Sequence, residues 1–259
     1  MACAADFINA VEFYDSFVVR DSQGYGMGLQ LFPWFAPVAT SVSRGAVLRE
    51  SDAVPVRSCW GGMVAFGAEP FLRSDVLRGS ERGGVNESEE PLRFRHQSEL
   101  YWEESECCLL NSDLAARRGK NEVKIFLNPY VRVAYGAITW GLLPLVRRFE
   151  RVFSILQYCV SKVGYPEYNP RRSEIPGQPS TQLRWVYDDE SFNGEVMRNL
   201  SMRIEKDRLG GRWEMVEEIA EPGGFCGQRR LFLMKKDLEN ANKDSRGRNW
   251  EKGPFPRIK

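Results

Sequence analysis

The sequence has little of the residue chemistry on which most nucleophilic and metal-dependent enzymes rely. Its 259 residues include one histidine, His96. A single histidine argues against most metal sites and against Ser-His or Cys-His catalysis. None of the six cysteines stands in a Cys-x-x-Cys pair, so a structural zinc site is not expected. Any acid–base chemistry is therefore expected to depend on carboxylates.

A strong net charge and long apolar runs are also missing. The formal net charge is +1, which gives no overall field, and no basic stripe is interleaved with aromatic residues. Nucleic acid is therefore not an expected partner. The uncharged run at 133–146 is too short to span a bilayer, and it contains Pro144. The first residues lack the basic start and apolar core of a signal peptide.

The cysteines allow two interpretations. Their even number permits disulfides in an oxidising compartment, with fifteen possible pairings for six cysteines. Buried free thiols are an equally good interpretation.

The chain has the composition of a globular domain, with 42% hydrophobic residues. Loose alternation predicts a strand at 13–20, and apolar residues around a small turn predict a strand–turn–strand unit at 54–66. A strand pair broken by Asn128-Pro129 is expected at 123–135, and a closing strand at 229–235.

Helical patterns lie between these strands. Apolar spacing predicts one amphipathic helix at 144–163 with proline in its first turn, and a second within 191–206. The segment 104–119 is either a strand or a short helix. These elements predict a mixed α/β or α+β domain over 1–235. It carries a mobile loop at 78–90 and a proline-rich linker at 164–180, and a disordered tail follows at 236–259.

Several polar clusters interrupt the apolar strings. Asp15, Arg20 and Asp21 form either a surface ion pair or a group in which the arginine binds a phosphate or a sugar hydroxyl. Trp60, beside Gly61, is either a core residue at a hairpin turn or the apolar wall of a ligand-facing loop.

Two more polar clusters each allow a structural and a functional interpretation. Glu106 enters an apolar run and is a helix cap, an edge charge, or a desolvated acid or nucleophile. At 221–230 three glycines precede Arg229 and Arg230. That segment is either a tight turn or a binding loop for a diphosphate.

The order of these motifs carries more information than any one of them. The series YDSFVVRD, VPVRSCWGGMVAF, SECCLL, NPYVRVAY and PGGFCGQRR resembles the fungal capsule-associated α-1,3-mannosyltransferase family, glycosyltransferase family 69. The resemblance implies a GT-A-like α/β fold and retaining transfer of mannose from GDP-mannose to a glycan acceptor, usually with Mn²⁺. It also implies a Golgi or other secretory-pathway lumen and an N-terminal membrane anchor.

The resemblance also implies roles for individual residues. The loop of Cys59, Trp60, Gly61 and Gly62 would lie against the donor sugar. The remaining roles would fall to Glu106 for the acceptor or the developing cation, Arg20 and Arg229 for the diphosphate, and Asp15 or Asp21 for sugar hydroxyls. Glu106 and Asp21 are the expected catalytic residues.

Two departures from the family pattern carry expectations of their own. Gly61 stands where the family usually has asparagine, so the loss of a polar contact is expected there. The chain contains no Asp-x-Asp, so its metal ligands are unknown. We expect the C-terminal portion of a GT-A-like enzyme that does not turn over GDP-mannose alone. The alternatives are a catalytically dead sugar-binding or scaffolding remnant and a purely structural domain.

Overall fold

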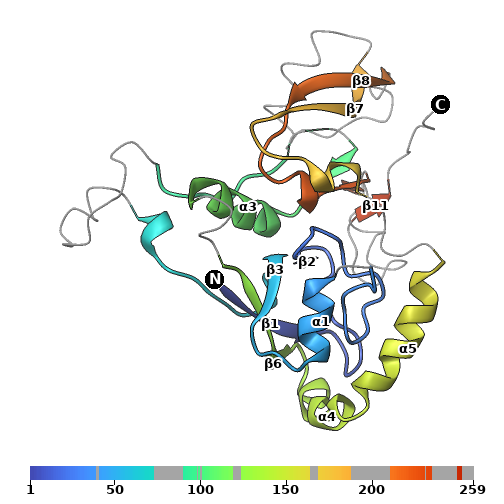
Figure 1. Cartoon of the computed structure of the whole chain (residues 1–259). Coiled ribbons are helices and arrows are strands. Elements are labelled where there is room, and N and C mark those ends of the chain that lie inside the picture. The colour runs from blue at the N-terminus through green and yellow to red at the C-terminus, as the bar shows by residue number, and fades with distance from the viewer. Residues whose placement is uncertain are drawn as a thin grey trace. The chain divides into compact units, whose positions relative to one another are not determined.

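The computed structural model describes most of the chain, in two compact units (Figure 1). Unit 1 comprises residues 1–95, 105–176 and 221–226, and unit 2 comprises residues 96–104, 177–220 and 227–259. The described residues are 1–38, 41–72, 90–97, 99, 101–118, 124–163, 169–187, 211–230, 232–234 and 250–252.

Unit 1 contains a five-stranded mixed sheet with the order β2-β3-β6-β1-β4. Strands β1 and β6 are parallel, and the other neighbours are antiparallel. Five of the six residues of β1 are buried, as expected for an inner strand covered on both faces. The strands are β1 (Ala2–Phe7), β2 (Arg20–Asp21), β3 (Val54–Ser58), β4 (Val64–Ala65) and β6 (Phe126–Ala134).

The strand pair expected at 123–135 is one strand with an irregularity. In the β1–β6 register Ala4 faces Asn128, but the next residue, Ala5, faces Arg132. The Asn128 side chain accepts the backbone N–H groups of Tyr130 and Val131, so the chain bulges without leaving the sheet.

The hairpin expected at 54–66 is wrong in its pairing. Strands β3 and β4 both form, but β3 pairs with β2 and β6, whereas β4 pairs with β1. Positive φ angles at Gly61 (58°) and Gly62 (64°) turn the chain across β1, so the two strands separate.

The strand expected at 13–20 is also wrong. Phe13 makes an isolated bridge to Phe7, and regular pairing begins only at Arg20. Between them the Val19 N–H bonds the Asp15 carbonyl, a local turn that alternation of side chains does not reveal.

Four helices of more than one turn are described in unit 1, namely α1 (Val42–Leu48), α3 (Glu106–Arg118), α4 (Ala137–Arg147) and α5 (Glu150–Ser161). The segment 104–119 is therefore the helix of the two alternatives. The single helix expected at 144–163 is two helices that meet at Arg148 and Phe149. Pro144 lies inside α4 rather than in a first turn. Short 3-10 turns are η1 (Glu69–Phe71), η2 (Pro170–Ser173) and η4 (Gly224–Cys226).

Two disulfides connect these elements. Cys3–Cys59 joins β1 to the end of β3, and Cys108–Cys226 joins α3 to η4. Cys107 and Cys159 are free thiols. The disulfide interpretation therefore holds for four of the six cysteines, and each bond stabilises the fold by roughly 2–4 kcal/mol.

The described residues of unit 2 form three pairs of antiparallel strands. The longest pair is β7 (Pro179–Tyr187) with β8 (Gly211–Ile219), and Trp185 and Trp213 on it contact Tyr101. The other pairs are β5 (Trp102–Glu103) with β9 (Gln228–Arg229), and β10 (Phe232–Met234) with β11 (Trp250–Lys252).

Several expected segments lie largely outside the described residues. These are the loop at 78–90, except its last residue, the helix within 191–206, and the start of the linker at 164–180. In the described part of that linker, η2 and the first residues of β7 form. Within the tail only β11 is described. No helix among the described residues is both long and apolar enough to cross a membrane.

Candidate functional site: a carboxylate pair beneath a glycine loop

The loop after β3 lies directly on strand β1. A Cβ on Gly61 would stand 1.9 Å from the Ala4 carbonyl oxygen, and the Ala4 N–H bonds the Met63 carbonyl at 2.9 Å. Only glycine combines this approach with a φ of +58°. The glycine pair therefore has a physical cause in the contact with β1.

Asp15 fixes the same loop from the other side. Its Oδ2 accepts the Gly61 N–H at 2.8 Å, and the backbone amides of Val18 and Trp60 also favour its charged form. Asp15 lies in the irregular segment between β1 and β2, which the turn at Val19 brings back over the sheet.

Asp6 is a second buried carboxylate at this place, and the sequence analysis missed it. It is the penultimate residue of β1 and is 1% exposed. A Cβ on Gly62 would lie 3.3 Å from the Asp6 Cβ, so the loop covers the carboxylate. A charged residue near the end of the otherwise apolar ACAADF run was the available signal.

One oxygen of Asp6 is satisfied and the other is not. Oδ2 accepts the Tyr135 hydroxyl at 3.2 Å. Oδ1 is buried and has no hydrogen-bond partner among the described residues. A buried carboxylate oxygen without a donor costs free energy, so a ligand hydroxyl that reached it would be strongly bound.

Burial raises the pKa of both carboxyl groups. The pKa of Asp15 is raised to about 6, first by desolvation and then by the charge of Asp6, while the Gly61 amide opposes the shift. Desolvation also raises the pKa of Asp6, against the hydrogen bond from Tyr135. Desolvation and the charge of Asp6 raise the pKa of Tyr135 to about 12, which keeps this hydroxyl a donor. Carboxyl groups whose pKa is raised by burial are characteristic of a site that holds or moves protons.

Glu106 is the first residue of α3, and its side chain is exposed rather than desolvated. The neighbouring thiol of Cys107 interacts electrostatically with both Glu106 and Asp15. The pKa of Cys107 is raised to about 11 by burial and then by the charges of Glu106 and Asp15. The Asn111 side chain bonds the carbonyls of Cys59 and Cys107, and so joins the glycine loop to the start of α3.

Trp60 is partly buried and fits both of its interpretations. Its indole packs against the two core clusters that include Leu109 and Leu110. It also makes an edge contact with Phe94 at 5.7 Å between ring centroids. Part of the indole is therefore core, and the rest is a wall beside the glycine loop.

Arg20 and Asp21 hold backbone in the structure. Arg20 donates to the carbonyls of Phe225 and Cys226 at 3.2 and 3.0 Å, and also to those of Ser16 and Val19. Asp21 Oδ1 accepts two amides of the following turn, and burial raises its pKa. Their expected roles toward the diphosphate and in catalysis stay predictions.

Cys59 and Arg229 each have structural partners, and their expected ligand contacts stay predictions. Cys59 is fully buried in its disulfide, so it supports the loop through the bond to Cys3. Arg229 belongs to unit 2, where it donates to the Leu183 carbonyl at 2.6 Å and lies over Trp102 and Trp213. The glycine-rich segment at 221–230 is thus divided between the two units.

A pocket of about 630 Å³ lies in unit 1, and none of Asp6, Asp15 or Gly61 lines it. Two arginines, Arg57 and Arg172, line it together with Gly223 and Gly224 of the glycine-rich segment. Desolvation and the charge of Arg172 lower the pKa of Arg57. The pocket offers polar and cationic groups for a ligand beside the end of η4.

The residues offer a limited set of metal ligands. Among the described residues, no group of three or more histidine, cysteine, aspartate or glutamate side chains is arranged to hold a cation. Asp6 and Asp15 supply two carboxylates at most. A hard cation accepts one or two protein carboxylates when substrate phosphates and water complete its shell. The pair therefore fits a cation only together with the diphosphate of a donor.

A family comparison covers this site. Residues 1–113 match the family model described as Cryptococcal mannosyltransferase 1. The N-terminal part of the chain is therefore similar to this mannosyltransferase family. The matched range includes Asp6, Asp15, the glycine loop and Glu106, and it ends before Tyr135 and Arg229. Comparisons with curated proteins and with solved structures found no match.

The match to a mannosyltransferase family implies a sugar donor and an acceptor as substrates. In this context the glycine loop and the two buried carboxylates form the candidate active site. They are the described groups of the matched range that combine close backbone approach, an unpaired acceptor and raised carboxyl pKa values.

Proposed function

We propose that this chain carries the mannosyl-transfer site of a retaining GDP-mannose-dependent α-1,3-mannosyltransferase with a GT-A-like plan. The observation that carries the proposal is the buried Asp6 carboxylate with its unpaired Oδ1, covered by the Gly61–Gly62 loop inside the range of the family match. Sugars present hydroxyl donors, and a buried carboxylate oxygen is their strongest acceptor.

The residues divide the work of transfer. The bond between the anomeric carbon and the diphosphate breaks, and the acceptor hydroxyl oxygen forms a new bond to that carbon. GDP leaves, and the proton of the hydroxyl passes to solvent. Asp6 and Asp15 hold donor hydroxyls, and the glycine backbone lets the sugar ring approach without a side chain in the way. Trp60 provides the apolar wall. Glu106, exposed at the start of α3, is placed for the acceptor.

A divalent cation belongs to this proposal as a shared ligand. Mn²⁺ would be held by Asp6 or Asp15 together with the donor diphosphate, and when bound it supplies charge neutralisation for the leaving group. The ionised form of Asp15, which predominates above about pH 6, is the form that binds a cation.

A secretory-pathway lumen, such as that of the Golgi, is the proposed location. Two disulfides favour an oxidising compartment, because cytosolic thiols are kept reduced. A membrane anchor outside the present chain is part of the same proposal.

A sugar-binding protein without turnover is the second candidate. It is favoured by the absence, among the described residues, of a three-ligand metal group. Such a protein would use the same loop and carboxylates to bind a donor or a glycan.

Transfer assays on the whole chain distinguish the two. The purified 259-residue chain would be incubated with GDP-mannose, MnCl₂ and mannose-containing oligosaccharide acceptors, with release of GDP and product anomer as readouts. Acceptor-dependent GDP release with an α-linked product supports the transferase. Saturable donor binding without release supports the second candidate. Failure of a folded chain to bind donor or acceptor would reject both.

A further inference from the structure

Helices α4 and α5 turn their apolar side away from the unit that carries them. Figure 1 shows them as consecutive helices after β6. The most exposed large apolar residues within the two helices are Ile138 (82%), Ile155 (67%) and Val152 (65%). The other exposed aromatic or aliphatic residues of the helices are Trp140, Leu142, Leu145, Leu156 and Tyr158, and the exposed Phe149 and Val163 flank α5.

The buried side of α5 is polar, which is the reverse of an ordinary surface helix. Its buried residues are Glu150 and Gln157. Gln157 donates to the carbonyls of Leu29 and Leu31, both at 3.1 Å, and accepts from Arg44 at 2.6 Å. Each of these hydrogen bonds is specific, so α5 is held in this orientation rather than lying loosely on the surface.

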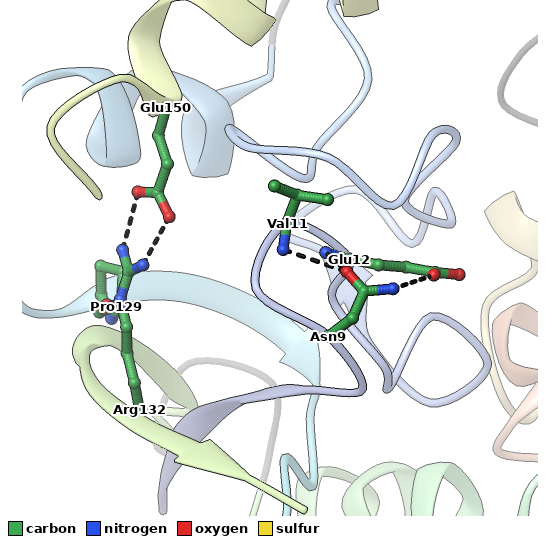
Figure 2. Close-up of polar contacts among 6 residues, drawn as sticks. All are labelled: Asn9, Val11, Glu12, Pro129, Arg132 and Glu150. Atoms are coloured by element: carbon green, nitrogen blue, oxygen red, sulfur yellow. Dashed lines mark hydrogen bonds and ion pairs between the residues drawn. The ribbon is translucent and has the colours of Figure 1, made fainter. Parts of the chain in front are cut away.

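Glu150 is the second polar anchor. Arg132 of β6 donates both guanidinium ends to its carboxylate, one at 2.8 Å, as Figure 2 shows. Both side chains of this pair are less than a tenth exposed. The anchors at Glu150 and Gln157 therefore require the apolar residues of α5 to point outward.

The exposed charges of this face have one sign. Between residues 137 and 162 the basic residues are Arg147, Arg148, Arg151 and Lys162, and the one acidic residue is the buried Glu150. Arg151 pairs with Glu50, and the other three have no carboxylate partner among the described residues. A pocket of about 350 Å³ where α4 meets α5 is lined by Arg132, Arg147, Arg148 and Arg151, with Glu50 and Glu150.

This combination identifies one occupant. A concentration of exposed large apolar residues on two consecutive helices marks a docking surface. Aromatic and aliphatic residues beside unpaired arginine and lysine suit a bilayer surface with anionic headgroups, which attract cations while the apolar side chains enter the acyl boundary. A protein partner with both acidic and basic residues would not explain why the exposed charges of these helices are all positive. The helices have 11 and 12 residues, which is too short to span a bilayer. They would therefore lie in the plane of the membrane interface.

We propose that α4 and α5 bind the surface of a membrane that contains anionic phospholipid. The lipid phosphates contact the exposed cations Arg147, Arg148 and Lys162. Trp140, Phe149 and Ile155 enter the boundary of the acyl chains. This proposal stands on the two helices and does not depend on mannosyl transfer.

Vesicle flotation of the whole chain is the test. Vesicles of phosphatidylcholine with about a third phosphatidylglycerol would be compared with pure phosphatidylcholine, and we expect the chain to float with the anionic vesicles and much less with the neutral ones. The triple variant Ile138→Ser/Val152→Ser/Ile155→Ser should lose at least tenfold in vesicle affinity. The double variant Arg148→Gln/Lys162→Gln should lose about fivefold per charge removed.

Matched controls separate the face from general stickiness. Met215→Ser/Ile219→Ser removes comparably exposed apolar residues from β8 and should leave vesicle binding unchanged. Circular dichroism verifies that each variant is folded. If the serine variant does not fold, quenching of Trp140 fluorescence by brominated lipid, judged against Trp140→Phe, gives the same answer in an otherwise native chain.

Three results would overturn the proposal. One is the absence of binding to anionic vesicles by the folded chain. Another is binding that both helix variants retain. The third is a dimer in light scattering that the serine variant converts to monomer without any vesicle binding, because the face would then be covered by a second copy.

Discussion

The carboxylate of Asp15 accepts the backbone N–H of Gly61 at 2.8 Å, which connects the irregular segment after β1 to the glycine loop after β3. These residues are far apart in the chain, and neither belongs to a regular element. The bond forms because Gly61, pressed against the Ala4 carbonyl, directs its amide toward Asp15. The candidate site therefore depends on the geometry of a loop.

Substitution of the two glycines should have unequal effects. Gly61→Ala places a Cβ 1.9 Å from backbone in a left-handed conformation, so we expect a loss of at least about 2 kcal/mol in the free energy of unfolding. Gly62→Ala meets Asp6 only at 3.3 Å and should cost about 1–2 kcal/mol. Urea denaturation measures both, with Gly67→Ala as the control because nothing lies within 4 Å of its added Cβ. Equal stability of Gly61→Ala and Gly67→Ala would show that the loop does not lie on β1.

The raised pKa of Asp15 predicts a pH-dependent stability difference. The folded pKa is about 6 against an ordinary 3.8, so the native state binds this proton more tightly than the unfolded state does. The contribution of Asp15 is therefore fully present below about pH 4 and is lost as the pH rises through about 6. Relative to wild type, Asp15→Asn should gain up to about 3 kcal/mol between pH 4 and pH 7. Denaturation at several pH values checks this. A difference that stays flat or falls would mean that Asp15 is not desolvated.

The two free thiols should react at very different rates. Cys159 is exposed, whereas Cys107 is partly buried and has its pKa raised from 9.0 to about 11. The thiolate fraction of Cys107 at pH 8 is then about a hundredfold lower than that of an ordinary cysteine. Iodoacetamide labelling followed by peptide mapping should find Cys159 modified first and Cys3, Cys59, Cys108 and Cys226 unmodified without reductant. Early modification of Cys107 would contradict the position of Glu106 and Asp15 beside it.

The buried ion pair between Arg132 and Glu150 of α5 predicts a large loss in the free energy of unfolding when one partner is removed. Arg132→Met leaves the buried Glu150 carboxylate unpaired, and we expect a loss of about 3–5 kcal/mol. The double variant Arg132→Met/Glu150→Gln should recover part of that loss, because no buried charge remains. Denaturation of the single and double variants forms the test. An Arg132→Met protein as stable as wild type would indicate that Glu150 reaches solvent.

The sequence predicts the elements of this fold better than their connections. Periodicity located β3 and the apolar stretch that became α4 and α5, and it left the segment 104–119 open between a strand and the helix that forms, α3. It could not separate β3 from β4, because pairing depends on how Gly61 and Gly62 cross β1, a contact between residues distant in the chain. It also could not place a break at Arg148, since apolar spacing continues through it.

The candidate site was predictable in part for the same reason. Trp60, Gly61 and Gly62 stand out by composition, and Asp15 stands out as a charge in an apolar string. Asp6 does not stand out in the sequence, where it is one charged residue at the end of a short apolar run. Its importance comes from burial beneath the loop and from an oxygen without a donor, and both are properties of the assembled structure.

The affinity of the whole chain for GDP-mannose, with and without Asp6, tests the central claim most directly. Isothermal titration in the presence of Mn²⁺ would compare wild type, Asp6→Asn, and Asp52→Asn as an exposed control. Our account predicts saturable binding by wild type and Asp52→Asn, and at least about tenfold weaker binding by Asp6→Asn, the loss expected for a charge-assisted hydrogen bond. Equal affinity of Asp6→Asn and wild type, or no binding by the folded wild-type chain, would contradict it.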